Sequence, residues 1–260
     1  ALFFISVNLG GALGNVVFGP LADGWGYVTM GWAMVGGIVV IVVAASALLP
    51  GIEPPISAQR RTLLQSLTGY GPIVRRSRVR WLLGIRFLPT CMWGAATVAF
   101  PYLIFTATDS LSQPAFYTAA SLLVATCGQL AIGRLCDHFG RRWPVRASAA
   151  AVLVFSLLAA VSASSLVGLW ICGIGMTVSG WSLSTTMPGL MSEMSTPQEK
   201  GRIVGAAHLA WALGMVSGSA GAGWLLQFGP SVCYYVGSVC CAGAVVCAWR
   251  IFPALETTRT

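Results

Sequence analysis

Charged residues are scarce in this sequence. Only 8% of its 260 residues are Asp, Glu, Lys or Arg, and 7 acidic side chains stand against 15 basic ones. A soluble domain carries about a quarter charged residues, so the scarcity argues against a soluble globular protein. The formal charge of +8 does not indicate a nucleic-acid partner, because the basic residues fall in or near loops between apolar runs.

The sequence also lacks the residue clusters of common enzymes and metal proteins. It has no CxxC or HExxH cluster, no GxxxxGK[ST] phosphate loop and no evident nucleophile–base set. We therefore expect neither an enzyme nor a bound cofactor or metal. Most of the eight cysteines lie in apolar runs, and only Cys172 and Cys233 approach the outer face, so we expect small helix residues rather than a disulfide framework.

Long hydrophobic runs dominate what is present. Apolar residues make up 56% of the chain, and the mean hydropathy is +0.79. Runs of about 20 apolar residues are long enough to cross a bilayer as helices. Eight can be drawn, which predicts an all-α, polytopic transmembrane helical bundle: 1–22, 29–50, 81–107, 114–132, 144–163, 167–190, 203–226 and 231–252.

The basic residues alternate along the chain. Four connecting segments carry Arg or Lys, namely 51–80, 133–143, 191–202 and 253–260, and four carry none, namely 23–28, 108–113, 164–166 and 227–230. By the positive-inside rule the first set is cytoplasmic. We expect a multi-pass protein of the plasma (inner) membrane with a cytoplasmic C-terminus. The run Arg75–Arg80 is either a topogenic charge cluster or a contact for anionic lipid.

One polar segment has a recognisable pattern. Residues 133–142 read Gly-Arg-Leu-Cys-Asp-His-Phe-Gly-Arg-Arg between two apolar runs, which suits a tight hairpin with Asp137 accepting backbone N–H bonds or pairing with Arg141. The pattern Gly-x-Leu-x-Asp-x-x-Gly-Arg-Arg resembles the signature loop of the major facilitator superfamily of secondary transporters. The resemblance implies a bundle of twelve helices in two related halves.

A loose internal repeat agrees with two halves. Leu13-Gly14-Asn15-Val16 resembles Leu213-Gly214-Met215-Val216, 200 residues later. By resemblance, residues 1–50 are the last two helices of the N-terminal half, 51–80 the cytoplasmic linker, 81–252 the C-terminal half and 253–260 a cytoplasmic tail. The sequence opens inside an apolar run, so we expect a fragment covering helices five to twelve, with four helices encoded upstream.

The segment Gly19–Gly26 has two interpretations. It resembles either a second signature loop or the glycine-proline element of drug–proton antiporters at the end of helix five. The lack of arginine and the short distance to residue 133 favour helix five. Asn15 and Asp23 stand where the antiporter motif has glycine. Small residues at Gly10, Gly11, Gly14 and Gly19 are expected mainly to let helices pack closely.

Two sets of site residues follow. The resemblance implies a cytoplasmic gate in which an acidic residue pairs with the signature arginines: Gly133, Asp137, Gly140, Arg141, Arg142 and Glu193. Polar groups deep in a span, with tryptophans on the same helix faces, are candidates for a substrate cavity. These are Asn8, Asn15, Arg86, Trp93, Gln129, His208 and Trp211.

Several of these residues have structural interpretations as well. Asn8 and His208 correspond under the repeat and are expected to face one central cavity, but His208 could equally form a hydrogen bond between helices. Arg86 could snorkel to the cytoplasmic interface, which we favour slightly over a role in the cavity. No carboxylate lies deep in a span, so a coupling proton would be carried elsewhere or by His208.

We therefore expect a secondary transporter that moves a small solute across the lipid bilayer by alternating access. We favour proton-coupled efflux of an amphipathic or drug-like compound, with H+ as the candidate coupling ion. The alternatives are a solute uptake symporter, a non-transporting scaffold or sensor on the same fold, and an eight-span channel.

Overall fold

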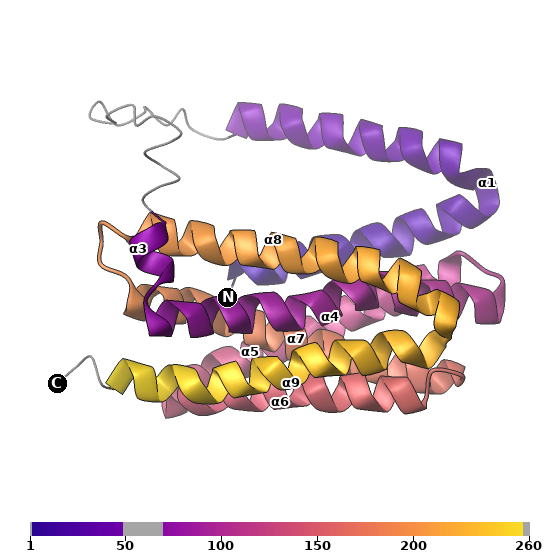
Figure 1. Ribbon diagram of the computed structural model, residues 1–260. Helices are drawn as coiled ribbons and strands as arrows, with labels where there is room; N and C mark the ends of the chain where they lie inside the picture. The colour runs from indigo at the N-terminus through magenta and orange to yellow at the C-terminus, as the bar shows by residue number, and fades with distance from the viewer. Residues whose placement is uncertain (1, 49–69, 257–260) are drawn as a thin grey trace.

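The computed structural model describes residues 2–48 and 70–256, and within them it contains helices and no strands. Long helices run side by side in a bundle (Figure 1). Their bounds are α1 Leu2–Leu48, α3 Gly71–Val74, α4 Ser77–Thr108, α5 Ser112–Phe139, α6 Arg142–Val161, α7 Leu166–Met194, α8 Lys200–Leu225 and α9 Pro230–Glu256, with a 3-10 turn, η1, at Leu226–Phe228.

Helix α1 contains two of the predicted spans. Its backbone is helical except at Gly26, whose φ of 79° and ψ of 167° are not helical and divide it into two halves. Only glycine adopts this conformation readily, so the chain reverses there with almost no loop. Figure 1 shows the second half of α1 running back from this turn. Residues 19–25 are helical, which agrees with the interpretation of Gly19–Gly26 as the end of a helix.

Helix α4 is the centre of the bundle, because it packs against α8, α9, α7 and α5. Its contact with α8 is close: a Cβ on Gly94 would meet the carbonyl of Met215, and one on Gly214 would lie 2.7 Å from the Phe87 carbonyl oxygen. Small residues allow this approach in lipid, where apolar helices gain little from association alone. The first half of α1 packs along α5.

Two buried clusters fill the bundle. One contains the aromatic rings of Phe100, Tyr117 and Tyr234, with Phe100 and Tyr234 5.0 Å apart between centroids. The other lies toward the opposite ends of the helices and includes Leu82 and Leu190. Both lie among α4, α6, α7 and α9, so the described C-terminal helices form one packed unit around α4.

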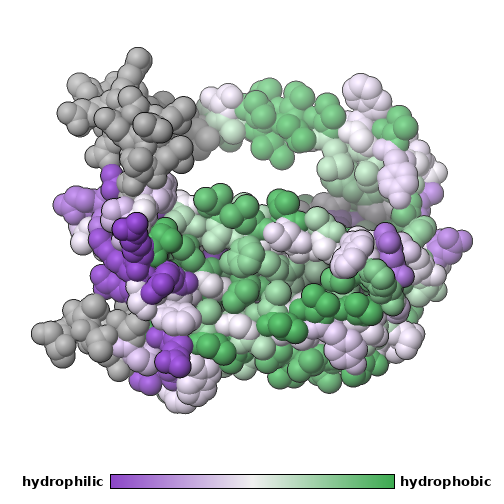
Figure 2. All heavy atoms as spheres, in the orientation of Figure 1, coloured by the Kyte–Doolittle hydropathy of each residue, from purple (hydrophilic) through white to green (hydrophobic). Residues whose placement is uncertain are grey.

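The outside of the bundle is apolar. Figure 2 shows apolar side chains along the helices and hydrophilic ones gathered at the end where α3 and the last turns of α9 lie. Large apolar residues such as Trp32, Val40 and Val216 are exposed. Seven helices of the described part are long and apolar enough to cross a membrane, α1 among them. The protein is therefore an integral, multi-pass membrane protein.

The helix boundaries correct one prediction. Residues 133–139 do not form a hairpin, because α5 continues to Phe139 and the turn is limited to Gly140 and Arg141. Nothing before Gly140 breaks the helix, and polar residues in the last turns can extend beyond the hydrocarbon. Gly140 has a φ of 71°, which explains a glycine at that position. Gly133 meets no neighbour within 4 Å and is not a close-approach residue.

Candidate functional site

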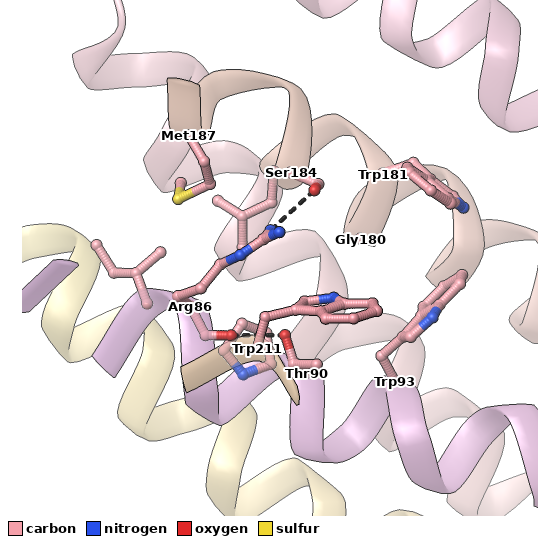
Figure 3. A pocket seen from close by; sticks show the side chains of 11 residues that line it. Arg86, Thr90, Trp93, Gly180, Trp181, Ser184, Met187 and Trp211 are labelled. Carbon is pink, nitrogen blue, oxygen red and sulfur yellow. Dashed lines mark hydrogen bonds between the residues drawn. The ribbon is translucent and has the colours of Figure 1, made fainter. Parts of the chain in front are cut away.

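A cavity lies among α4, α7 and α8 (Figure 3). Its volume is about 500 Å³, counted to its open mouth. Trp93 is close to the middle of α4, so the cavity is at mid-depth of the bundle. The lining is mostly apolar and includes three tryptophans: Ile85, Arg86, Pro89, Thr90, Trp93, Gly180, Trp181, Leu183, Ser184, Met187 and Trp211.

Arg86 is the charged residue of this lining. Its side chain is buried, with only 9% of the residue exposed. Nη1 donates a hydrogen bond to Ser184 Oγ on α7 at 2.9 Å, and the guanidinium carbon lies 6.0 Å from the centroid of Trp211. Nε has no hydrogen-bond partner among the described residues. Arg86 therefore stays inside the bundle, and the snorkelling interpretation is wrong.

Aromatic rings form the walls of the cavity. Trp93 and Trp181 meet edge to face, with ring centroids 6.2 Å apart and an interplanar angle of 79°. Figure 3 shows these two rings near each other, with the ring of Trp211 nearer to Arg86. Such surfaces bind flat apolar groups, and their negative faces also attract cations. Trp93 and Trp211 were expected in the cavity from the sequence, whereas Trp181 was not.

The cavity continues along α4. Trp93 also lines a second cavity of about 440 Å³ between α4, α5 and α7. The second shares Thr97, Pro101 and Thr118 with a third and wider space of about 1170 Å³ beside α1 and α5. The three spaces form a series that runs from mid-depth toward the end of α4 at Thr108.

The other predicted cavity residues lie elsewhere. Asn8 on α1 donates from Nδ2 to Gln129 Oε1 on α5 at 3.1 Å, and both residues are buried. Asn15 bonds the Gly11 carbonyl oxygen of its own helix at 2.8 Å. His208 is exposed on α8. Of these four residues, only Asn15 lines one of the three spaces, the wide one beside α1.

Asn8 and His208 do not lie together as the repeat predicts. Asn8 contacts Gln129, and His208 does not line the space around Arg86, so the structure does not gather the two residues in one cavity. A role for His208 in transport stays a prediction.

The predicted gate residues lie at the end of the bundle that carries most of the arginines, here called the basic end. Arg141 donates from Nη1 to Glu193 Oε1 at 2.6 Å, joining the start of α6 to the end of α7. The guanidinium lies where a side chain on Gly189 would be, so this glycine makes room for it. Asp137 and Arg142 are close to this pair in sequence, and both are exposed. Asp137 lies in the last turn of α5 and Arg142 in the first turn of α6.

A second ion pair at the basic end was not predicted. Arg76 donates through both Nη atoms to the Glu199 carboxylate, at 2.6 and 2.9 Å. It connects the turn between α3 and α4 to the start of α8. The hydrogen bonds from Arg76 hold the pKa of Glu199 below its ordinary value. Nothing in the sequence distinguishes Arg76 from its neighbouring arginines, and the partners are 123 residues apart.

Asp23 makes a third contact that the sequence did not reveal. It lies at the end of the first half of α1, and its carboxylate accepts from the backbone N–H groups of Leu111 at 2.8 Å and Ser112 at 2.7 Å. The hydroxyls of Ser110 and Ser112 also donate to it. A carboxylate of α1 therefore caps the N-terminus of α5, where free N–H groups and the helix dipole favour an anion.

The comparison with known families agrees with this architecture. A family model described as Major Facilitator Superfamily matches residues 82–260. The match covers α4 to α9, which include the Arg86 cavity and the Arg141–Glu193 pair. Among curated proteins, none is similar enough to the chain to match it. The chain belongs to the major facilitator superfamily, a family of secondary transporters.

Proposed function

We propose that the protein moves a small solute by alternating access and that the solute binds in the cavity around Arg86. The observation that carries this proposal is a buried cation and three tryptophans that converge on one space at mid-depth of a membrane bundle. Secondary transporters place their substrates near the bilayer midplane, where either side can be opened in turn. The series of cavities along α4 offers a route from that point toward one end of the bundle.

The ion pair between Arg141 and Glu193 is proposed to be part of a gate. It joins α6 to α7 at the basic end, which the positive-inside rule assigns to the cytoplasm of a plasma (inner) membrane. An exposed ion pair contributes about 0–1 kcal/mol. This is enough to bias two conformations of nearly equal free energy, since about 1.4 kcal/mol changes an equilibrium tenfold. The pair can thus break and re-form during a transport cycle.

Export of an amphipathic compound, with H+ as the coupling ion, is the direction that we propose. The aromatic walls suit an apolar body, and the glycine-proline element lies in α1. His208 is exposed on its span, and an imidazole ring has one nitrogen that accepts and one that donates, so it is the proposed proton carrier among the described helices.

The proposal is tested with purified protein in sealed liposomes. Vesicles are loaded with an unlabelled aromatic compound, and entry of its labelled form is followed with and without an imposed pH gradient. If the protein is a transporter, uptake is saturable and is accelerated by substrate inside the vesicles. Protein-free vesicles are expected to show no such uptake. Uptake that rises linearly with concentration and carries current would indicate a channel. Tight binding with no flux would indicate a sensor.

A further inference from the structure

We propose, resting on the transport function above, that the substrate is an organic anion with one carboxylate on a flat apolar body. Arg86 binds the carboxylate, and Trp93, Trp181 and Trp211 hold the body. This assigns a substrate class and a role to each of the four residues. Three features of the site support it: the charge of Arg86, the unpartnered edge of its guanidinium and the shape of the cavity.

The charge of Arg86 is not balanced by the described part of the chain. The salt bridges found there join Arg76 to Glu199 and Arg141 to Glu193, both at the basic end. Burying a cation without an opposite charge is costly, and more so in a membrane protein. The single hydrogen bond to Ser184 satisfies one of the five N–H groups of the guanidinium. An anion that enters the cavity would remove this cost.

The guanidinium has an edge whose Nε is buried without a partner among the described residues, so an anion reaches this edge when the side chain turns toward the cavity. Ser184 accepts from Nη1, while Nε has no partner among the described residues. Nε and Nη2 form the side of the guanidinium that binds a carboxylate through two parallel hydrogen bonds. Thr90, also in the lining, is held by a bond from its hydroxyl to the Arg86 carbonyl oxygen at 2.5 Å. A planar, two-oxygen anion therefore fits this edge better than a cation or a neutral group.

The tryptophans determine the rest of the ligand. The Trp211 ring is centred 6.0 Å from the guanidinium carbon, and Figure 3 shows Trp93 and Trp181 farther away. The anionic group must therefore be attached directly or by a short linker to the apolar body that contacts Trp211. The lining contains a single charged residue, and a second carboxylate on the ligand would be buried without a partner. The cavity therefore favours aromatic monocarboxylates over dicarboxylates, sugars and cations.

Arg146 offers a matched control. It is also buried, with 5% of the residue exposed, but it lies on α6 outside the cavity. Its guanidinium stacks on Trp249, 4.2 Å from the ring centroid, and donates to the Trp249 carbonyl oxygen at 3.3 Å. Removing its charge tests the general effect of losing a buried arginine in this bundle.

The experiment measures equilibrium binding of tritiated indole-3-acetate to the purified protein in lipid nanodiscs. Competitors are matched pairs, each an aromatic carboxylate and its carboxamide, such as indole-3-acetate with indole-3-acetamide and 2-naphthoate with 2-naphthamide. We expect saturable binding, with each carboxamide weaker than its carboxylate by about tenfold or more, the loss expected when a charge-assisted pair of hydrogen bonds is removed.

The variants separate the roles. Arg86→Gln is expected to lose about tenfold or more in carboxylate affinity and to bind acid and amide alike, because its side chain has no charge. Arg86→Lys keeps the preference for the acid with reduced affinity, and Arg146→Gln keeps the wild-type preference. Size-exclusion profiles verify that each variant is folded.

Three results would overturn the proposal. The first is wild-type protein that binds none of the carboxylates, and the second is equal binding of acids and amides. The third is an Arg86→Gln variant that loses stability but keeps the preference for acids, which would mean that Arg86 balances an acidic side chain of the protein. Binding of acids without flux in liposomes would refute transport and leave the anion site. Saturable flux of neutral compounds alone would support transport and refute the anion site.

Discussion

Arg86 and Arg146 show how the surroundings of one residue type determine its role. Arg146 is enclosed by Trp249 and the neighbouring rings Trp143 and Phe252, so its charge faces aromatic groups and a carbonyl oxygen of the protein itself. Arg86 has one ring at 6.0 Å, one hydroxyl and an open cavity. The surroundings of Arg146 stabilise packing at the basic end. Those of Arg86 leave N–H groups that can donate to a ligand.

Gly189 allows a test of the Arg141–Glu193 pair without touching either charge. A methyl group there would occupy the position of the Arg141 guanidinium, so Gly189→Ala should displace it from Glu193. We expect a changed transport rate with a change in unfolding free energy of no more than about 1 kcal/mol. The measurement is flux and thermal stability of this variant beside Gly201→Ala, at a glycine with nothing within 4 Å.

A double-mutant cycle tests the mechanism of that effect. If Gly189→Ala acts by moving Arg141, it should have no further effect in an Arg141→Gln background. The same effect in both backgrounds would show that Gly189 matters for the packing of α7 and not for the ion pair.

The site residues were predictable to different degrees. Arg141 and Glu193 were expected to pair because the signature pattern fixes their positions in the family, and the structure places them together. Arg86 was recognised as a charge in a span, but its sequence neighbours could not show that Ser184, 98 residues away, would hold it inside the bundle. Asn8 and His208 were matched only by their positions in the repeat. Such a match does not show which way each side chain faces around its helix axis.

At the scale of elements, the contact between α1 and α5 is the best defined connection between the two predicted halves. Asn8 bonds Gln129 at one level, a Cβ on Gly11 would lie 3.0 Å from Leu122 at the next, and Gly19 lies against Ala115. Asp23 then caps α5 at the far end. The small residues at Gly11 and Gly19 were expected to serve packing, whereas Gly10 has no neighbour within 4 Å.

Asp23→Asn should weaken the end of this contact. Both carboxylate oxygens accept backbone N–H groups, Oδ1 from Leu111 and Oδ2 from Ser112. An asparagine side chain has one acceptor oxygen, so at least one of these N–H groups must lose its partner. We expect faster hydrogen–deuterium exchange of the 110–113 segment and a lower melting temperature. The measurement is exchange mass spectrometry on the purified protein.

Asp109→Asn is the matched control. It removes the same charge from within the turn that Asp23 contacts, and asparagine tolerates the left-handed φ of 51° at this position. Equal acceleration of exchange in both variants would mean that the loss of charge, and not the cap on α5, controls the segment.

For the whole molecule, the sequence predicted the fold better than it predicted the ends of the helices. Each of the eight predicted spans corresponds to a helix or to half of α1, because hydrophobic length is a strong signal in a membrane protein. Helices α4, α5 and α7 extend beyond the ends of the predicted spans. Polar residues in these last turns are solvated beyond the hydrocarbon, so hydropathy ends before the helix does. The predicted linker 51–80 lies mostly outside the described residues.

The orientation of the bundle in the membrane follows from its shape and charge. Helix α4 has 32 residues, and at about 1.5 Å per residue it is longer than the roughly 30 Å hydrocarbon core. Ser77 at its start and Asp109 just after its end must therefore lie on opposite sides. The basic end, with Arg76, Arg141 and Arg202, is expected on the cytoplasmic side.

Labelling with a membrane-impermeant maleimide mass tag tests this orientation in intact cells. Asp109→Cys is expected to react at once, whereas Ser77→Cys is expected to react only after the membrane is permeabilised. The parent protein provides the blank, because its eight cysteines are free and either buried, partly buried or, at Cys127, within a span. Reaction of Ser77→Cys alone would invert the orientation and place the Arg141–Glu193 pair on the outer side. Reaction of both before permeabilisation would mean that α4 does not cross the membrane, which its length, its apolar surface and its central place in the bundle all oppose.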